Sequence, residues 1–90
     1  MPYNTITTWN PLPPPEEIPY LHNKRDEMIA RGLTDGTREL SYPNGDGIAP
    51  RIATRTWTTI EAAQEWKTHC EAATPVAPES VVITVWETVS

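Results

Sequence analysis

The sequence predicts an α+β fold in which an antiparallel sheet carries two helices on one face. The first observation is the order of the expected elements, which is strand, helix, strand, strand, helix, strand. The second is the length of 90 residues, which allows one small domain. The third is the composition, because 38% hydrophobic residues suffice for a core and ten prolines mark element boundaries. This combination is typical of a ferredoxin-like β-α-β-β-α-β domain.

The N-terminal part of the chain is expected to form a strand followed by a rigid proline-rich segment. Residues 3–9 are β-branched and aromatic, but three of them are threonines, which is polar for a central strand. Residues 10–15 hold four prolines, so they form neither a helix interior nor a central strand. We therefore divide the chain into 1–15 and a small α+β domain at 16–90. An alternative stays open, in which residues 1–15 are an arm on another molecule and the rest is a compact α-β-β-α-β unit.

The next segments predict a helix and a hairpin. Pro15 and the two glutamates after it favour a helix start, because proline and carboxylates suit the first turn. Gly32 suits the position just past a helix, so we expect the helix over about 16–31. Residues 38–42 and 51–57 read as two strands, joined by a long loop rich in glycine and proline.

The second helix has the clearest sequence signals. Thr58 and Glu61 have the spacing of a capping box, and Trp57 stands where a hydrophobic staple packs. Thr74 ends the helix, because the residue before a proline avoids the α region. One apolar stripe at helical spacing predicts the side that faces the core; it consists of Ala63, Trp66, Cys70 and Ala73.

Residues 81–89 form the most strongly β segment of the chain. The segment contains one charge, Glu87, and an unpaired edge of this kind promotes aggregation. We therefore expect residues 81–89 to pair either with the first strand of the same chain or with a partner.

The composition and the motifs weigh against several classes of function. Lone Cys70 excludes an internal disulfide framework and a multi-cysteine zinc site. A net charge of −5 is unlike that of a nucleic-acid binder, and no apolar run has the length of a membrane span. The first residues lack the pattern of a signal peptide.

No catalytic motif is present, and His69 with Glu65 is expected to be a surface pair. We therefore expect no enzyme activity, no cofactor and no metal.

Three arginines raise a separate question. Arg51 and Arg55 alternate to the same strand face as Trp57, and Arg38 lies on the neighbouring strand. A basic and aromatic sheet face suggests RNA stacking. The glycine-aromatic signature of RNA-recognition modules is missing and the net charge has the wrong sign, so we do not expect a nucleic-acid partner.

The proline segment and the aromatic residues are the candidate contacts for a protein partner. A preformed extended segment loses little entropy when it binds, and tryptophan and tyrosine are common interface anchors. The competing interpretation is that the aromatic residues only fill a core that has no phenylalanine. The candidate partner-binding residues are Tyr3, Trp9, Pro13, Pro14 and Trp86.

The run from Arg55 to Trp66, RTWTTIEAAQEW, is followed by a proline-broken linker and a Val/Ile strand. This pattern resembles short proteins of tailed bacteriophages, especially cyanophage-like ones, over about residues 55–85. The resemblance implies a virion or accessory component located in the virion or the host cytoplasm. We therefore predict a non-enzymatic assembly protein that binds a protein partner or further copies of itself.

A second resemblance leads to the alternative. The W-x-S/T-x-E-A-A run is also similar to dimeric ferredoxin-like proteins of the antibiotic-biosynthesis-monooxygenase type. That resemblance implies a small enzyme with a closed apolar cavity for a hydrophobic substrate. No site residue of that family is identified in this chain, and the polar candidates are His22, His69 and Tyr42. A third interpretation is an adaptor that binds one host protein through isolated Arg and Trp contacts.

Overall fold

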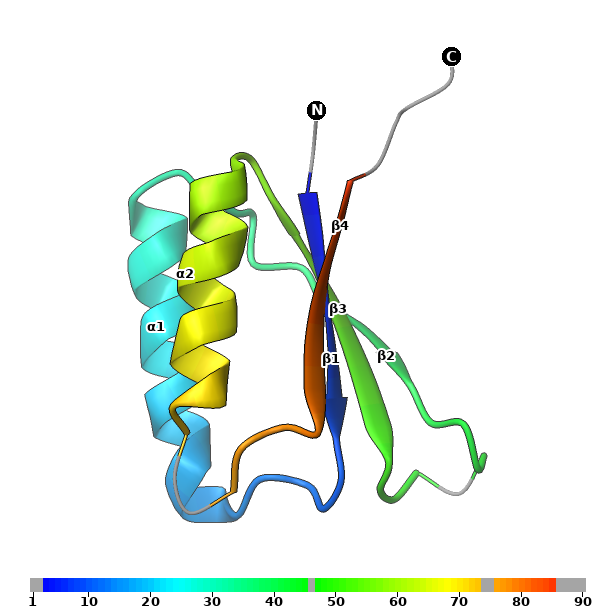
Figure 1. The fold of residues 1–90 in the computed structure, drawn as a ribbon. Coiled ribbons are helices and arrows are strands. Elements are labelled where there is room, and N and C mark those ends of the chain that lie inside the picture. The colour runs from blue at the N-terminus through cyan, green and yellow to red at the C-terminus, as the bar shows by residue number, and fades with distance from the viewer. Residues whose placement is uncertain (1–2, 46, 74–75, 86–90) are drawn as a thin grey trace.

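Two helices cover one face of a four-stranded antiparallel sheet (Figure 1). A computed structural model describes residues 3–45, 47–73 and 76–85. The elements follow the predicted order, with a short 3-10 helix before the first α-helix: β1 (Tyr3–Trp9), η1 (Pro15–Glu17), α1 (Ile18–Ala30), β2 (Glu39–Ser41), β3 (Arg51–Trp57), α2 (Ile60–Glu71) and β4 (Ser80–Val85). The strand order β2-β3-β1-β4 is that of a ferredoxin-like fold, so the predicted fold class is confirmed.

β1 is a central strand despite its threonines. Tyr3 is paired with Trp57 of β3 on one side and with Val85 of β4 on the other. The Thr5 hydroxyl, fully buried, accepts a hydrogen bond of 2.9 Å from the indole N–H of Trp57, so its polarity is satisfied inside the core. Residues 3–9 therefore do not form the arm of the alternative architecture. The expected pairing of β4 with the first strand of its own chain is confirmed.

The core lies between the sheet and the two helices. Trp57, Met28 and Cys70 are fully buried, and the rings of Trp57 and Trp66 lie 5.4 Å apart between centroids. All four residues of the predicted apolar stripe, Ala63, Trp66, Cys70 and Ala73, are buried.

Neither α1 nor α2, the two α-helices of the described residues, has the length and apolar character that crossing a membrane requires.

The ends of the helices differ in how well the sequence predicted them. Gly32 has a φ of +74°, and the N–H groups of Gly32 and Leu33 donate to Ile29 and Met28, as in a Schellman motif. The predicted end of α1 is therefore confirmed to within one residue.

The predicted cap of α2 is wrong by one residue. The capping residue is Thr59, whose hydroxyl accepts a bond of 3.1 Å from the N–H of Ala62. The backbone N–H of Thr58 donates instead to the carbonyl of Leu33, which lies in the turn directly after α1. The helix consequently begins after Thr59 and not before it. Of the predicted last strand, residues 86–89 lie outside the described residues.

Candidate functional site

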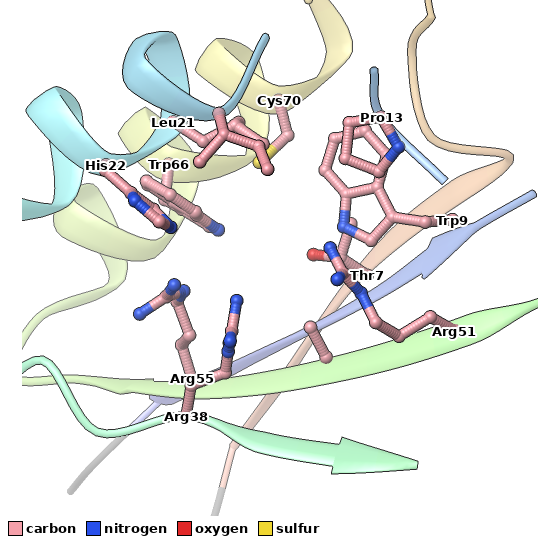
Figure 2. A pocket seen from close by; sticks show the side chains of 12 residues that line it. Thr7, Trp9, Pro13, Leu21, His22, Arg38, Arg51, Arg55, Trp66 and Cys70 are labelled. Atoms are coloured by element: carbon pink, nitrogen blue, oxygen red, sulfur yellow. The ribbon is translucent and has the colours of Figure 1, made fainter. Parts of the chain in front are cut away.

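The candidate site lies between α1 and the sheet. α2 packs on β1, β3 and β4, whereas no described Cα atom of α1 comes within 8 Å of a strand Cα atom. Long side chains lie between α1 and the sheet and leave a cavity of about 140 Å³ (Figure 2). The pocket is therefore a consequence of how the two helices sit on the sheet.

Arginine side chains form the sheet side of this pocket. Arg51 and Arg55 are two of the alternate residues of β3 that point toward the helices, and Arg38 comes directly before β2. Figure 2 shows the guanidinium groups of Arg38 and Arg55 pointing toward the helices, where His22 and Trp66 lie. Arg55 is 5% exposed, and its Cζ atom stands 5.0 Å from the centroid of the Trp66 ring. This is a cation–π contact across the pocket.

These arginines differ from the other basic residues in having no carboxylate partner in the described part of the chain. Lys24 and Arg31 both bind Glu65, Lys67 binds Glu71, and Arg25 binds Asp26. Within the described ranges, no carboxylate oxygen lies within 4.0 Å of Arg38, Arg51 or Arg55, and the buried Nε of Arg51 has no hydrogen-bond partner.. The pocket thus concentrates positive charge that no described side chain neutralises.

The pKa values of the pocket residues follow from burial and from this charge. Burial, together with the nearby charges of Arg38 and Arg25, lowers the pKa of Arg55 to about 10. Burial, followed by Arg25, Arg38 and Arg55, also lowers the pKa of His22, while Asp26 opposes the shift. A guanidinium with a pKa of about 10 is still charged at neutral pH. An anion in the pocket would therefore be attracted to at least three positive charges.

Apart from His22, the opposite side of the pocket is apolar. Cys70 lies there with its thiol protonated at neutral pH, because burial raises its pKa to about 12. It is consequently no nucleophile. The apolar lining on this side comes from the end of β1, the proline segment and the two helices: Trp9, Pro13, Ile18, Leu21, Trp66 and Cys70. The pocket therefore has two unlike sides: a charged floor, formed by Arg38, Arg51 and Arg55, and an apolar roof, formed by the apolar lining residues just named.

The predicted partner-binding residues are spread over different environments. Trp9 is 3% exposed and belongs to the core, and Pro13 is buried; both line the pocket. Tyr3 is half-buried against the core and Pro14 is half-buried, and neither lines the pocket. Trp86 lies outside the described residues. Trp9 is thus not an exposed anchor in this structure, and partner binding by these residues stays a prediction.

The polar candidates of the enzyme alternative are not brought together. His22 lines the pocket, while Tyr42 is half-buried in the connection after β2. His69 stacks on Tyr20 with ring centroids 3.8 Å apart, and the Tyr20 hydroxyl donates a 2.8 Å bond to the His69 carbonyl. The expected surface pair of His69 with Glu65 is wrong, because Glu65 binds cations of α1 instead.

The sequence contained part of the signal for this pocket. The alternation in β3 placed Arg51 and Arg55 on one face with Arg38 beside them, but it did not show that α1 stands away from the sheet.

Among the described residues, no group of three His, Cys, Asp or Glu side chains is arranged to hold a metal ion. No protein-family model matches the chain, and no curated protein is significantly similar to it.

Proposed function

We propose that this chain is a non-enzymatic binding domain that takes up a small anion in the arginine pocket. The observation that carries the proposal is that three arginines, Arg38, Arg51 and Arg55, line one cavity and have no carboxylate partner among the described residues. Guanidinium groups match the geometry of carboxylates and phosphates, and their hydrogen bonds to anions are among the strong ones in proteins. A bound anion would offset both the burial and the mutual repulsion of these charges.

The shape and charge of the molecule support a small anion over a nucleic acid. Nucleic-acid binding relies on an open basic surface that follows the phosphate backbone. Here the arginines line a cavity of about 140 Å³, and the whole chain carries a net charge of −5. The charge layout therefore favours an anion that fits inside the pocket.

The chemistry of the lining supports binding over catalysis. The described lining residues include no Asp or Glu, and the Cys70 thiol is protonated at neutral pH. His22 is the single histidine among the described lining residues; burial lowers its pKa, and it has no carboxylate beside it in the lining to form an acid–base pair.

A titration of the full chain with simple anions tests this function. We expect acetate, phosphate or sulfate, added in a buffer without other anions, to raise the melting temperature and to shift the amide NMR signals of β3 and His22 with saturation. Arg55→Met should abolish these effects. Arg31→Met is the matched control, because Arg31 binds Glu65 at 2.6 Å and does not line the pocket. Linear shifts without saturation, or equal effects in both variants, would contradict the proposal.

The open face of the sheet supports a second candidate function, which is assembly with a protein partner or with further copies of the chain. Ile6 and Val82 are paired across β1 and β4 on the face without helices, and Val82 is 51% exposed. Ile52 of β3 is half-buried on the same face. The phage resemblance implies the same class of function. A molar mass that stays at 10.1 kDa up to millimolar concentration in light scattering would contradict self-assembly.

A further inference from the structure

We infer that the occupant of the arginine pocket is a small organic anion, with a carboxylate or phosphate head on a compact apolar body. This inference rests on the proposed anion-binding function and names the class of ligand. It follows from the two unlike sides of the cavity and from its size.

The charged floor accounts for the head of the ligand. Arg38, Arg51 and Arg55 approach from the sheet, and the Nε of Arg51 is a buried donor without an acceptor. A buried donor without a partner costs free energy, and an oxyanion would supply the missing acceptor. Carboxylates and phosphate monoesters both provide such oxygens.

The apolar roof accounts for the body of the ligand. Leu21 and Trp66 face the arginines from the two helices, and Trp9 closes one end of the cavity next to Pro13 (Figure 2). An inorganic ion would contact the floor and leave this roof facing water. An organic anion would bury apolar surface against it, which adds about 25 cal/mol for each Å² removed from water.

The volume limits the size of the body. An apolar cavity of about 150 Å³ is known to take up benzene in an engineered protein, and the cavity here is about 140 Å³. One ring or a branched chain of similar size therefore fits, whereas a nucleotide or a fatty acid does not fit inside. Benzoate and phenyl phosphate are suitable probes for the two kinds of head.

The test compares probes that share a head or a body. We expect benzoate to bind the full chain at least tenfold more tightly than acetate in NMR titrations, and phenyl phosphate at least tenfold more tightly than phosphate. Benzamide, which has the ring without the charge, should bind at least tenfold more weakly than benzoate. The ratio between benzoate and phenyl phosphate then identifies the preferred head.

A pair of variants tests the roof without disturbing the core. Ile18 lines the pocket and Ile29 does not, and both lie on α1 with 39% of their surface exposed. Ile18→Ser should weaken benzoate severalfold and leave acetate unchanged, whereas Ile29→Ser should change neither affinity.

The outcomes separate this inference from the proposed function. Equal affinities for benzoate and acetate, with saturable binding of both, would overturn the organic-anion inference and leave anion binding intact. Equal affinities for benzamide and benzoate would overturn the role of the charged head. No saturable binding of any anion would overturn the proposed function itself.

Discussion

Arg55 is the residue at which binding and stability conflict. It is almost fully buried, and its described contacts include the Trp66 ring but no carboxylate. A buried charge without a counter-ion destabilises the folded chain, since removal from water is only partly compensated. We expect Arg55→Met to raise the free energy of unfolding by about 1 kcal/mol in a buffer without binding anions, measured by urea denaturation. A loss of more than about 1 kcal/mol would show that the guanidinium is already compensated.

His22 should make anion binding depend on pH. Burial and the charges of Arg25, Arg38 and Arg55 hold its pKa below the usual value. The unfolded chain therefore takes up the proton more readily, so the His22 contribution to stability falls as the pH drops through the ordinary histidine pKa of about 6.5. A bound anion favours the protonated ring, and binding should consequently tighten at lower pH.

The measurement is the dissociation constant of benzoate between pH 7.5 and pH 5.5, where the carboxylate stays ionised. We expect a lower constant at pH 5.5 in the native chain and a smaller change in His22→Gln. A pH dependence that is identical in both chains would assign the effect to another group.

At the scale of elements, Glu65 holds the two helices together. Its carboxylate forms ion pairs with Lys24 of α1 and with Arg31, the residue directly after α1. The hydrogen bonds from these two cations lower the pKa of Glu65 to about 2. The stabilisation is therefore present at pH values above about 4.5 and is lost as the pH falls toward 2. We expect Glu65→Gln to lower the free energy of unfolding by about 1 kcal/mol at pH 7 after allowance for solvent screening, and to have little effect near pH 2.

Glu71→Gln is the matched control for Glu65. Glu71 pairs with Lys67 one turn away in the same helix, and such exposed pairs contribute about 0.3–0.5 kcal/mol. If both variants lose the same stability at pH 7, the contact between the helices has no special weight.

The start of α2 offers a second test at this scale. The Thr59 hydroxyl caps the helix through the N–H of Ala62, whereas the Thr58 side chain is exposed. Thr59→Ala should cost about 1 kcal/mol in thermal or chemical unfolding, and Thr58→Ala less than half of that. The reverse order of the two losses would restore the capping box expected from the sequence.

Local patterns predicted the elements well because their causes are local. The stripe around Trp66 and Cys70 follows from helix periodicity, and the end of α1 follows from the left-handed conformation that Gly32 adopts. The start of α2 was harder, because a bond from Thr58 to Leu33, distant in sequence, decides it. Sequence spacing alone does not contain such a contact.

At the scale of the whole molecule, the distribution of charge matters more than its sum. The basic residues outside the pocket are paired with carboxylates, and Arg38, Arg51 and Arg55 are gathered at one cavity. The sequence predicted that Arg51 and Arg55 share a face with Arg38 on the neighbouring strand, and the net charge of −5 argued against a nucleic-acid partner. The pocket was not predictable, because it depends on the distance between α1 and the sheet.

This distribution predicts a weak dependence of binding on salt. A small ligand neutralises few charges, and the buried Arg55 is screened less than a surface charge. We expect the affinity for benzoate to change by less than about threefold between 50 and 200 mM salt, in contrast to the losses of about 10³ to 10⁵ typical of proteins that bind many phosphates. A steep decrease would instead indicate an open basic surface.

The pocket between α1 and the sheet also bears on how such a domain evolves. Leu21 of α1 lines the pocket and belongs to the core, whereas Arg38 and Arg51 line the pocket and lie outside the core. These two arginines are therefore freer to change than the core residues. Exchanging Arg38 and Arg51 for neutral or acidic residues would adapt the same scaffold to neutral or cationic ligands, so related chains with this fold can diverge in what they bind while the sheet and helices stay the same.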